Sequence, residues 1–89
     1  MHCHIYRSSR KPDTYLYLHG KDDFSVVPAD LLAIFGDPEF SFSFDLDGSR
    51  KLAKEDTSEV MENLKTQGYH LQLQKDLLIE QMLGLKTLN

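Results

Sequence analysis

The chain contains little cysteine and no long apolar run. Cys3 is the only cysteine among 89 residues, so an intramolecular disulfide is excluded and the fold does not require an oxidising compartment. The longest uninterrupted apolar run covers residues 31–35, far short of the roughly 20 residues that cross a bilayer. The chain begins with polar residues where a secretory signal needs an apolar stretch. We therefore expect a cytoplasmic protein without a membrane span.

Patterns that bind metal ions are also missing. The sequence has no Cys-x-x-Cys or His-Glu-x-x-His spacing. In a strand over residues 3–7, Cys3 faces away from both His2 and His4, so these three side chains cannot converge on one ion. A zinc site on His2 and His4 would need His19 or His70 as further ligands. The favoured interpretation is surface histidines beside a buried, apolar Cys3 that does not act as a nucleophile.

Calcium and phosphate motifs are incomplete. Residues 45–48, Asp-Leu-Asp-Gly, are similar to the start of a calcium loop. The twelfth position is Asp56 where such a loop has glutamate, and basic residues intervene. The five glycines are scattered along the chain, so no glycine-rich loop cradles a phosphate. We expect neither enzyme activity nor a cofactor; a small hydrolase or metal enzyme would need His19 or His70 beside Cys3 in a pocket.

Charge is unevenly distributed along the chain. The net charge is −4, with +2 in residues 1–20 and −6 in residues 21–89. A generally acidic domain binds nucleic acid poorly without a local basic patch. The residues that could form one come from the first loop and from the turn near residue 48, and they are Arg7, Arg10, Lys11, Arg50 and Lys51. A nucleic-acid role requires these two segments to share one edge; a solvated loop is the simpler interpretation.

The clearest pattern lies in residues 40–47. Apolar and polar residues alternate strictly in the order Phe40, Ser41, Phe42, Ser43, Phe44, Asp45, Leu46, Asp47. A period of two places the four apolar residues on one face of a β-strand. The pattern predicts a strand at the centre of the core, whose phenylalanines are core residues and not a stacking platform for bases. The serine face is expected to be less deeply covered.

Helix signals follow the second and third predicted strands. Pro28 suits the first turn of a helix, and Gly36 with Pro38 stops it. Asp56 and Glu59 have the spacing of a capping box that opens a second helix, and the glycine at position 68 ends it.

The remaining strands are predicted over residues 3–7, 14–18 and 69–73. The order β-β-α-β-α-β-α then predicts an α+β fold, a single compact domain in which helices pack on a four-stranded sheet.

The end of the chain differs in character from the rest. Residues 1–73 form the predicted domain, and residues 74–89 form an amphipathic helical tail. This helix could dock on its own domain, on a second copy or on a partner protein. The apolar residues expected to make the contact are Leu78, Met82 and Leu85. We expect a monomer or a weak homodimer.

Several short motifs follow one another in residues 3–73. They include Cys3-His4-Ile5-Tyr6-Arg7-Ser8, Thr14-Tyr15-Leu16-Tyr17, Asp22-Asp23-Phe24-Ser25, Phe35-Gly36-Asp37-Pro38, Leu46-Asp47-Gly48 and Gln67-Gly68-Tyr69 with Leu71-Gln72-Leu73. In this order and spacing they resemble the YcgL domain, a small bacterial family. The resemblance implies a compact α/β domain and brings no activity, cofactor or residue role with it. We expect a non-enzymatic protein-interaction module, with weak nucleic-acid association through the basic patch as the alternative.

Overall fold

The computed structural model describes residues 1–47, 52 and 55–73. Four strands form one sheet, and they are β1 (His2–Arg7), β2 (Tyr15–Leu18), β3 (Glu39–Asp45) and β4 (Tyr69–Gln72). The connecting elements are a 3₁₀ turn η1 (Phe24–Val26) and two helices, α1 (Ala29–Phe35) and α2 (Thr57–Thr66). The protein is thus a compact α+β domain, as predicted. The expected last helix, in residues 74–89, lies outside the described residues.

All neighbouring strands of the sheet are antiparallel, in the order β3-β1-β2-β4. The interior pair β1 and β2 is joined by a short loop, with Ile5 opposite Tyr17. β2 is apolar on both faces, and β1 buries Cys3 and Ile5 on one face and Tyr6 on the other, which suits the two central positions. The prediction that the strand in residues 40–47 lies at the centre of the core is wrong, because β3 is at the edge of the sheet, pairs with β1, and leaves Phe40 and Phe42 about half exposed.

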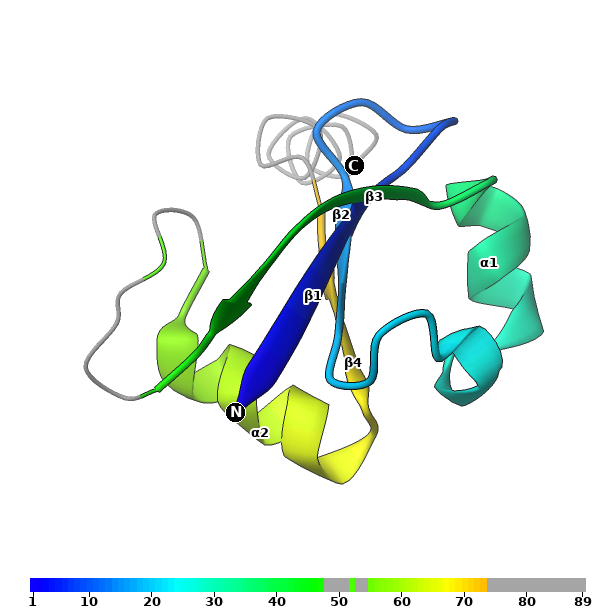
Figure 1. Ribbon diagram of the computed structural model, residues 1–89. Helices are drawn as coiled ribbons and strands as arrows, with labels where there is room; N and C mark the ends of the chain where they lie inside the picture. The colour runs from blue at the N-terminus through cyan, green and yellow to red at the C-terminus, as the bar shows by residue number, and fades with distance from the viewer. Residues whose placement is uncertain (48–51, 53–54, 74–89) are drawn as a thin grey trace, which may run out of the picture.

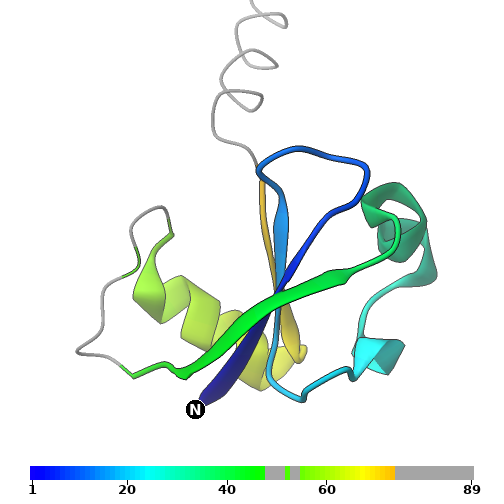
Figure 2. The same cartoon turned by 45° about the horizontal axis from the view of Figure 1, so that its top comes forward.

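The two helices lie on opposite sides of the sheet, α2 on one side and α1 with η1 on the other (Figures 1 and 2). The core is therefore divided in two. The cluster on the α2 side contains Cys3, Ile5, Tyr17, Leu46, Val60 and Leu64. The cluster on the α1 side contains Tyr6, Leu16, Leu18, Val27 and Phe35. Alternate residues of β1 and β2 feed one cluster each, as the period of two requires.

The ends of both helices match their sequence signals. Helix α1 follows Pro28 and stops at Gly36, whose φ of 81° is costly for residues with a Cβ. At the start of α2, the Asp56 carboxylate accepts a hydrogen bond from the Glu59 amide at 3.2 Å, which satisfies one of the orphan amides of the first turn. No helix among the described residues is long and apolar enough to span a membrane.

Candidate functional site

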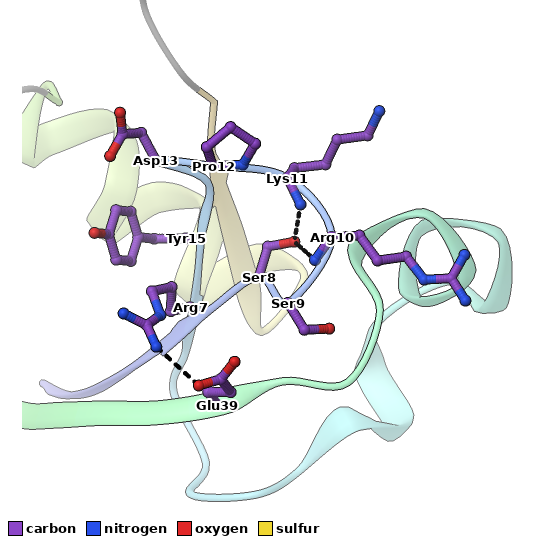
Figure 3. A pocket seen from close by; sticks show the side chains of 9 residues that line it. All are labelled: Arg7, Ser8, Ser9, Arg10, Lys11, Pro12, Asp13, Tyr15 and Glu39. Carbon is purple, nitrogen blue, oxygen red and sulfur yellow. Dashed lines mark hydrogen bonds and ion pairs between the residues drawn. The ribbon is translucent and has the colours of Figure 1, made fainter.

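The loop between β1 and β2 is organised by one buried serine. The Ser8 hydroxyl donates to the carbonyl of Phe35 at 2.6 Å. It accepts from the backbone amides of Arg10 at 3.1 Å and Lys11 at 2.8 Å. These bonds tie the loop to the end of α1, where a Cβ on Gly36 would approach the Ser9 hydroxyl to 2.5 Å. The loop is therefore held in one shape by hydrogen bonds between the Ser8 hydroxyl and backbone groups, and its long side chains are left at the surface (Figure 3).

A polar cleft of about 480 Å³ borders this loop. Its lining residues are Arg7, Ser8, Ser9, Arg10, Lys11, Pro12, Asp13, Tyr15 and Glu39. The Arg7 guanidinium donates to the Glu39 carboxylate at 2.8 Å, and this hydrogen bond raises the pKa of Arg7. The lining carries three cations and two carboxylates, so its net charge is only +1.

The predicted basic patch is brought together only in part. In Figure 3 Arg7 turns to Glu39, Arg10 extends towards α1, and Lys11 points away from the loop. The three side chains diverge, which gives no common point at which one phosphate could meet all of them. The other two members, Arg50 and Lys51, lie outside the described residues.

A second hollow, about 220 Å³ in volume, is apolar and lies between α1 and β4. Its apolar lining consists of Leu31, Ile34, Phe35, Leu71 and Leu73. Ile34 is 58% exposed and Leu73 is 44% exposed. The surface predicted on the tail, at Leu78, Met82 and Leu85, follows Leu73 in sequence and lies outside the described residues.

A β-bulge divides the phenylalanines of β3 between the two faces of the sheet. Phe42 is opposite Ile5, but Phe40 is opposite Tyr6, so Ser41 is the extra residue. The Phe40 ring packs edge-on against Tyr6 at 5.6 Å on the α1 side. Phe42 stacks on Phe44, also at 5.6 Å, on the α2 side. Strict alternation in the sequence therefore does not give one shared face.

Two of the three phenylalanines of β3 are not the core residues that the pattern predicted, whereas Phe44 is partly buried and packs against the α2-side cluster. Phe40 is 51% exposed and Phe42 is 50% exposed, whereas Leu46 is fully buried. The reason is the edge position, because β3 has a described strand on one side only. Ser41 and Ser43 are exposed, as expected.

A buried polar network between β2, β4 and α2 was missed by the sequence reasoning. The Tyr17 hydroxyl donates to the Gln72 side chain at 2.5 Å. The His70 ring lies 2.9 Å from the Asn63 amide and 3.2 Å from a Glu55 carboxylate oxygen. The His70 ring also packs edge-on against the Tyr17 ring, with 5.4 Å between the ring centroids. Burial raises the pKa of Tyr17 to about 12.

The signal for this network was present in the β4 sequence. His70 and Gln72 alternate with Tyr69 and Leu71, which are only half-buried, and both polar residues are 7% exposed. The alternation suggested a strand whose polar side faces water, but α2 covers that side. The network holds itself together with internal hydrogen bonds, which is the usual condition for burying polar groups.

The N-terminal histidines and Cys3 lie on the faces that alternation predicts. Cys3 is fully buried in the α2-side cluster, and burial raises the pKa of its thiol to about 12. His2 pairs with Asp45 at 2.7 Å on the surface. The His4 ring lies 2.6 Å from the Ser43 hydroxyl on the opposite face. Within the described ranges, no three His, Cys, Asp or Glu side chains are placed to hold a metal ion.

Comparison with known proteins gives the family of this fold. The model of the YcgL domain matches residues 3–75. The chain belongs to the YcgL domain family. A YcgL domain-containing protein of Thioalkalivibrio sulfidiphilus is 51% identical over 73 residues, which cover 82% of this chain and 90% of the relative.

Further relatives of this YcgL domain come from Cronobacter and Escherichia. A YcgL domain-containing protein of Cronobacter sakazakii is 55% identical over 73 residues, covering 82% of this chain and 80% of its own length. Protein YcgL of Escherichia coli is 46% identical over 92 aligned positions, covering 98% of this chain and 85% of its own length. These names carry no activity, so the function has to be argued from the surface of the domain itself.

Proposed function

We propose that this YcgL domain acts in the cytoplasm as a non-enzymatic protein-interaction module, and that β3 is its contact surface. The observation that carries the proposal is the exposure of two large aromatic side chains on one edge strand. Phe40 and Phe42 are each about half exposed, at 51% and 50%. Aromatic residues are enriched in the energetically important parts of protein interfaces.

The edge position supplies the second half of the argument. An edge strand presents unpaired backbone amides and carbonyls, which can add a strand from another chain. In such complexes the backbone hydrogen bonds give affinity, and side chains such as Phe42 give specificity. The two ends of β3 carry acidic residues, Glu39 and Asp45, which already pair with Arg7 and His2. These charged ends direct contact towards the middle of the strand.

Photo-crosslinking tests this surface directly. A photoreactive phenylalanine analogue at position 42 should form covalent adducts with a protein in living bacteria. The matched control is the same analogue at position 62, on the exposed side of α2, where no adduct is expected. Identical adducts at both positions, or none at position 42, would remove β3 as the contact surface.

The predicted tail offers a second contact surface for the same function. Its residues Leu78, Met82 and Leu85 begin a few positions after Leu73, which lines the apolar hollow beside α1. Replacing the three with serine in the full chain should remove a subset of partners if the tail makes contacts. Adducts and partners that stay unchanged in this variant would leave β3 as the sole proposed surface.

Weak nucleic-acid association is the alternative function. Among the described residues, the side chains that would contact the nucleic acid are Arg10 and Lys11, which line the polar cleft. RNA binding at low salt should be lost when both are changed to glutamate, because phosphate contacts dominate such affinity. Binding that survives this change would show that the patch is not responsible.

A further inference from the structure

We propose that the partner of β3 is β3 of a second copy of this chain, paired antiparallel about a two-fold axis at Ser43. The inference rests on the proposed function and names the partner of the same surface. Two-fold axes generate the commonest soluble oligomers, and they require a surface that complements itself. The segment Phe42-Ser43-Phe44 reads the same in both directions, which satisfies that requirement at the level of sequence.

Side-chain direction selects this register. In an antiparallel pair, directly opposite residues point to the same face of the sheet. An axis at Ser43 places Phe42 opposite Phe44 of the second copy, and both lie on the α2 side. The paired segment then stops before the bulge at Ser41. Registers that place Phe42 or Phe44 opposite Ser43 of the second copy put the two side chains on different faces and are excluded.

The neighbouring registers fail for separate reasons. An axis at Phe42 would pair Glu39 with Asp45 of the second copy and would run across the bulge in both strands. Like charges directly opposite each other destabilise a strand pair. An axis at Phe44 would require Leu46 to face Phe42 of the second copy, but Leu46 is fully buried in the α2-side cluster. In the Ser43 register Glu39 and Asp45 instead lie outside the paired segment.

The size of the contact sets its strength. Three residue pairs bury far less than the roughly 1,200 Å² at which stable protein interfaces begin. The bulge and the acidic ends limit any extension of the pairing, as is common in edge strands that avoid aggregation. The dimer is therefore weak, and its population rises with protein concentration.

Cysteine crosslinking tests the axis. In Ser43→Cys the two thiols would meet across the axis, because directly opposite Cα atoms lie within the roughly 4.4–6.8 Å that a disulfide spans. In the control Ser41→Cys they would be displaced by about four residues, or roughly 13 Å along the strand. Both serines are exposed, and native Cys3 is fully buried and does not compete. We expect at least tenfold more disulfide-linked dimer with Ser43→Cys; equal yields would overturn the register.

A pair of charge variants gives an independent measurement. Phe42→Glu places a carboxylate in the paired segment, whereas Phe40→Glu places it beyond the bulge on the other face. The two phenylalanines are equally exposed, at 50% and 51%. The mean mass from sedimentation should rise with concentration for the parent chain and for Phe40→Glu, and stay monomeric for Phe42→Glu. A parent chain that stays monomeric at millimolar concentration would overturn the dimer.

The two proposals fail in distinguishable ways. If position 42 crosslinks to a different protein while Ser43→Cys forms no dimer, the second copy is excluded and β3 remains a contact surface. If position 42 forms no adduct with any protein, including a second copy, both proposals are overturned.

Discussion

The outer strands β3 and β4 differ in which side chains they bury: β3 exposes aromatic side chains, and β4 buries polar ones. On β3 the aromatic side chains of Phe40 and Phe42 are about half exposed, at 51% and 50%. On β4 the polar side chains of His70 and Gln72 are buried, each at 7% exposure. Helix α2 packs on β4 and supplies Asn63 as a partner for His70. β3 carries the more apolar sequence, and yet it is the more exposed of the two strands.

The difference shows what decides burial in a small sheet. Alternation tells which residues share a face, and a bulge can break even that relation, as at Ser41. Coverage depends on which helix or strand lies next to the face. A polar side chain tolerates coverage when hydrogen bonds replace those it made to water, and Gln72 meets this condition through Tyr17.

The largest effect on stability is expected from alkaline pH, which acts on groups buried on the α2 side of the sheet. Burial raises the pKa of Cys3 from 9.0 and of Tyr17 from 10.0, each to about 12. Their neutral forms are favoured in the folded state, so stability is full below pH 9 and falls as pH rises towards 12. Each ionising group removes roughly 1.4 kcal/mol per pH unit in that window.

Urea unfolding measured from pH 7 to 11 checks the expectation. Cys3→Ala should flatten the decrease between pH 9 and 10, because the thiol is then absent from both states. A slope unchanged by this substitution would show that the thiol does not contribute.

The next largest effect is expected for His70→Ala on β4. The change leaves the Asn63 amide and the Glu55 carboxylate without their ring partner in a covered site. Loss of these contacts and of ring volume should lower the unfolding free energy by about 2–4 kcal/mol. The control is His19→Ala, since His19 is exposed and should change stability by under about 1 kcal/mol. Equal losses for both histidines in urea titrations would contradict the buried network.

A single hydroxyl deletion at Tyr17 should give a smaller loss. Tyr17→Phe leaves the Gln72 side chain without its donor, which costs about 1–2 kcal/mol. The double change Tyr17→Phe with Gln72→Leu should recover part of that loss, because no polar group is then left unsatisfied. If the double mutant loses more unfolding free energy than the two single changes together, apolar side chains cannot replace the polar pair.

The smallest effect on stability is expected for Phe42→Ala on β3. Because the ring is half exposed and β3 is an edge strand, the loss should stay under about 1 kcal/mol. The same change should weaken the concentration-dependent rise in mass that we propose for β3. A loss above 2 kcal/mol in thermal or urea unfolding would place Phe42 in the core and break the comparison.

The sequence predicted the elements better than their environment. The stops at Gly36 and Gly68 and the cap at Asp56 depend on local backbone chemistry, so they could be found without the fold. The face occupied by Cys3 followed from alternation within a short strand. The basic loop was found as well, but the divergence of Arg10 and Lys11 depends on how Ser8 ties that loop to α1.

Within the described residues, the sequence by itself determined where the strands and helices lie and where α1 and α2 stop, and it showed that residues 3–75 carry the pattern of the YcgL domain. Only the tertiary structure decided that β3 lies at the edge, that Ser41 is a bulge residue, and that His70 is buried against α2 and Gln72 against Tyr17. The physical reason is the range of the interactions. Caps, stops and alternation act within a few residues, whereas burial depends on which distant segment packs against a face.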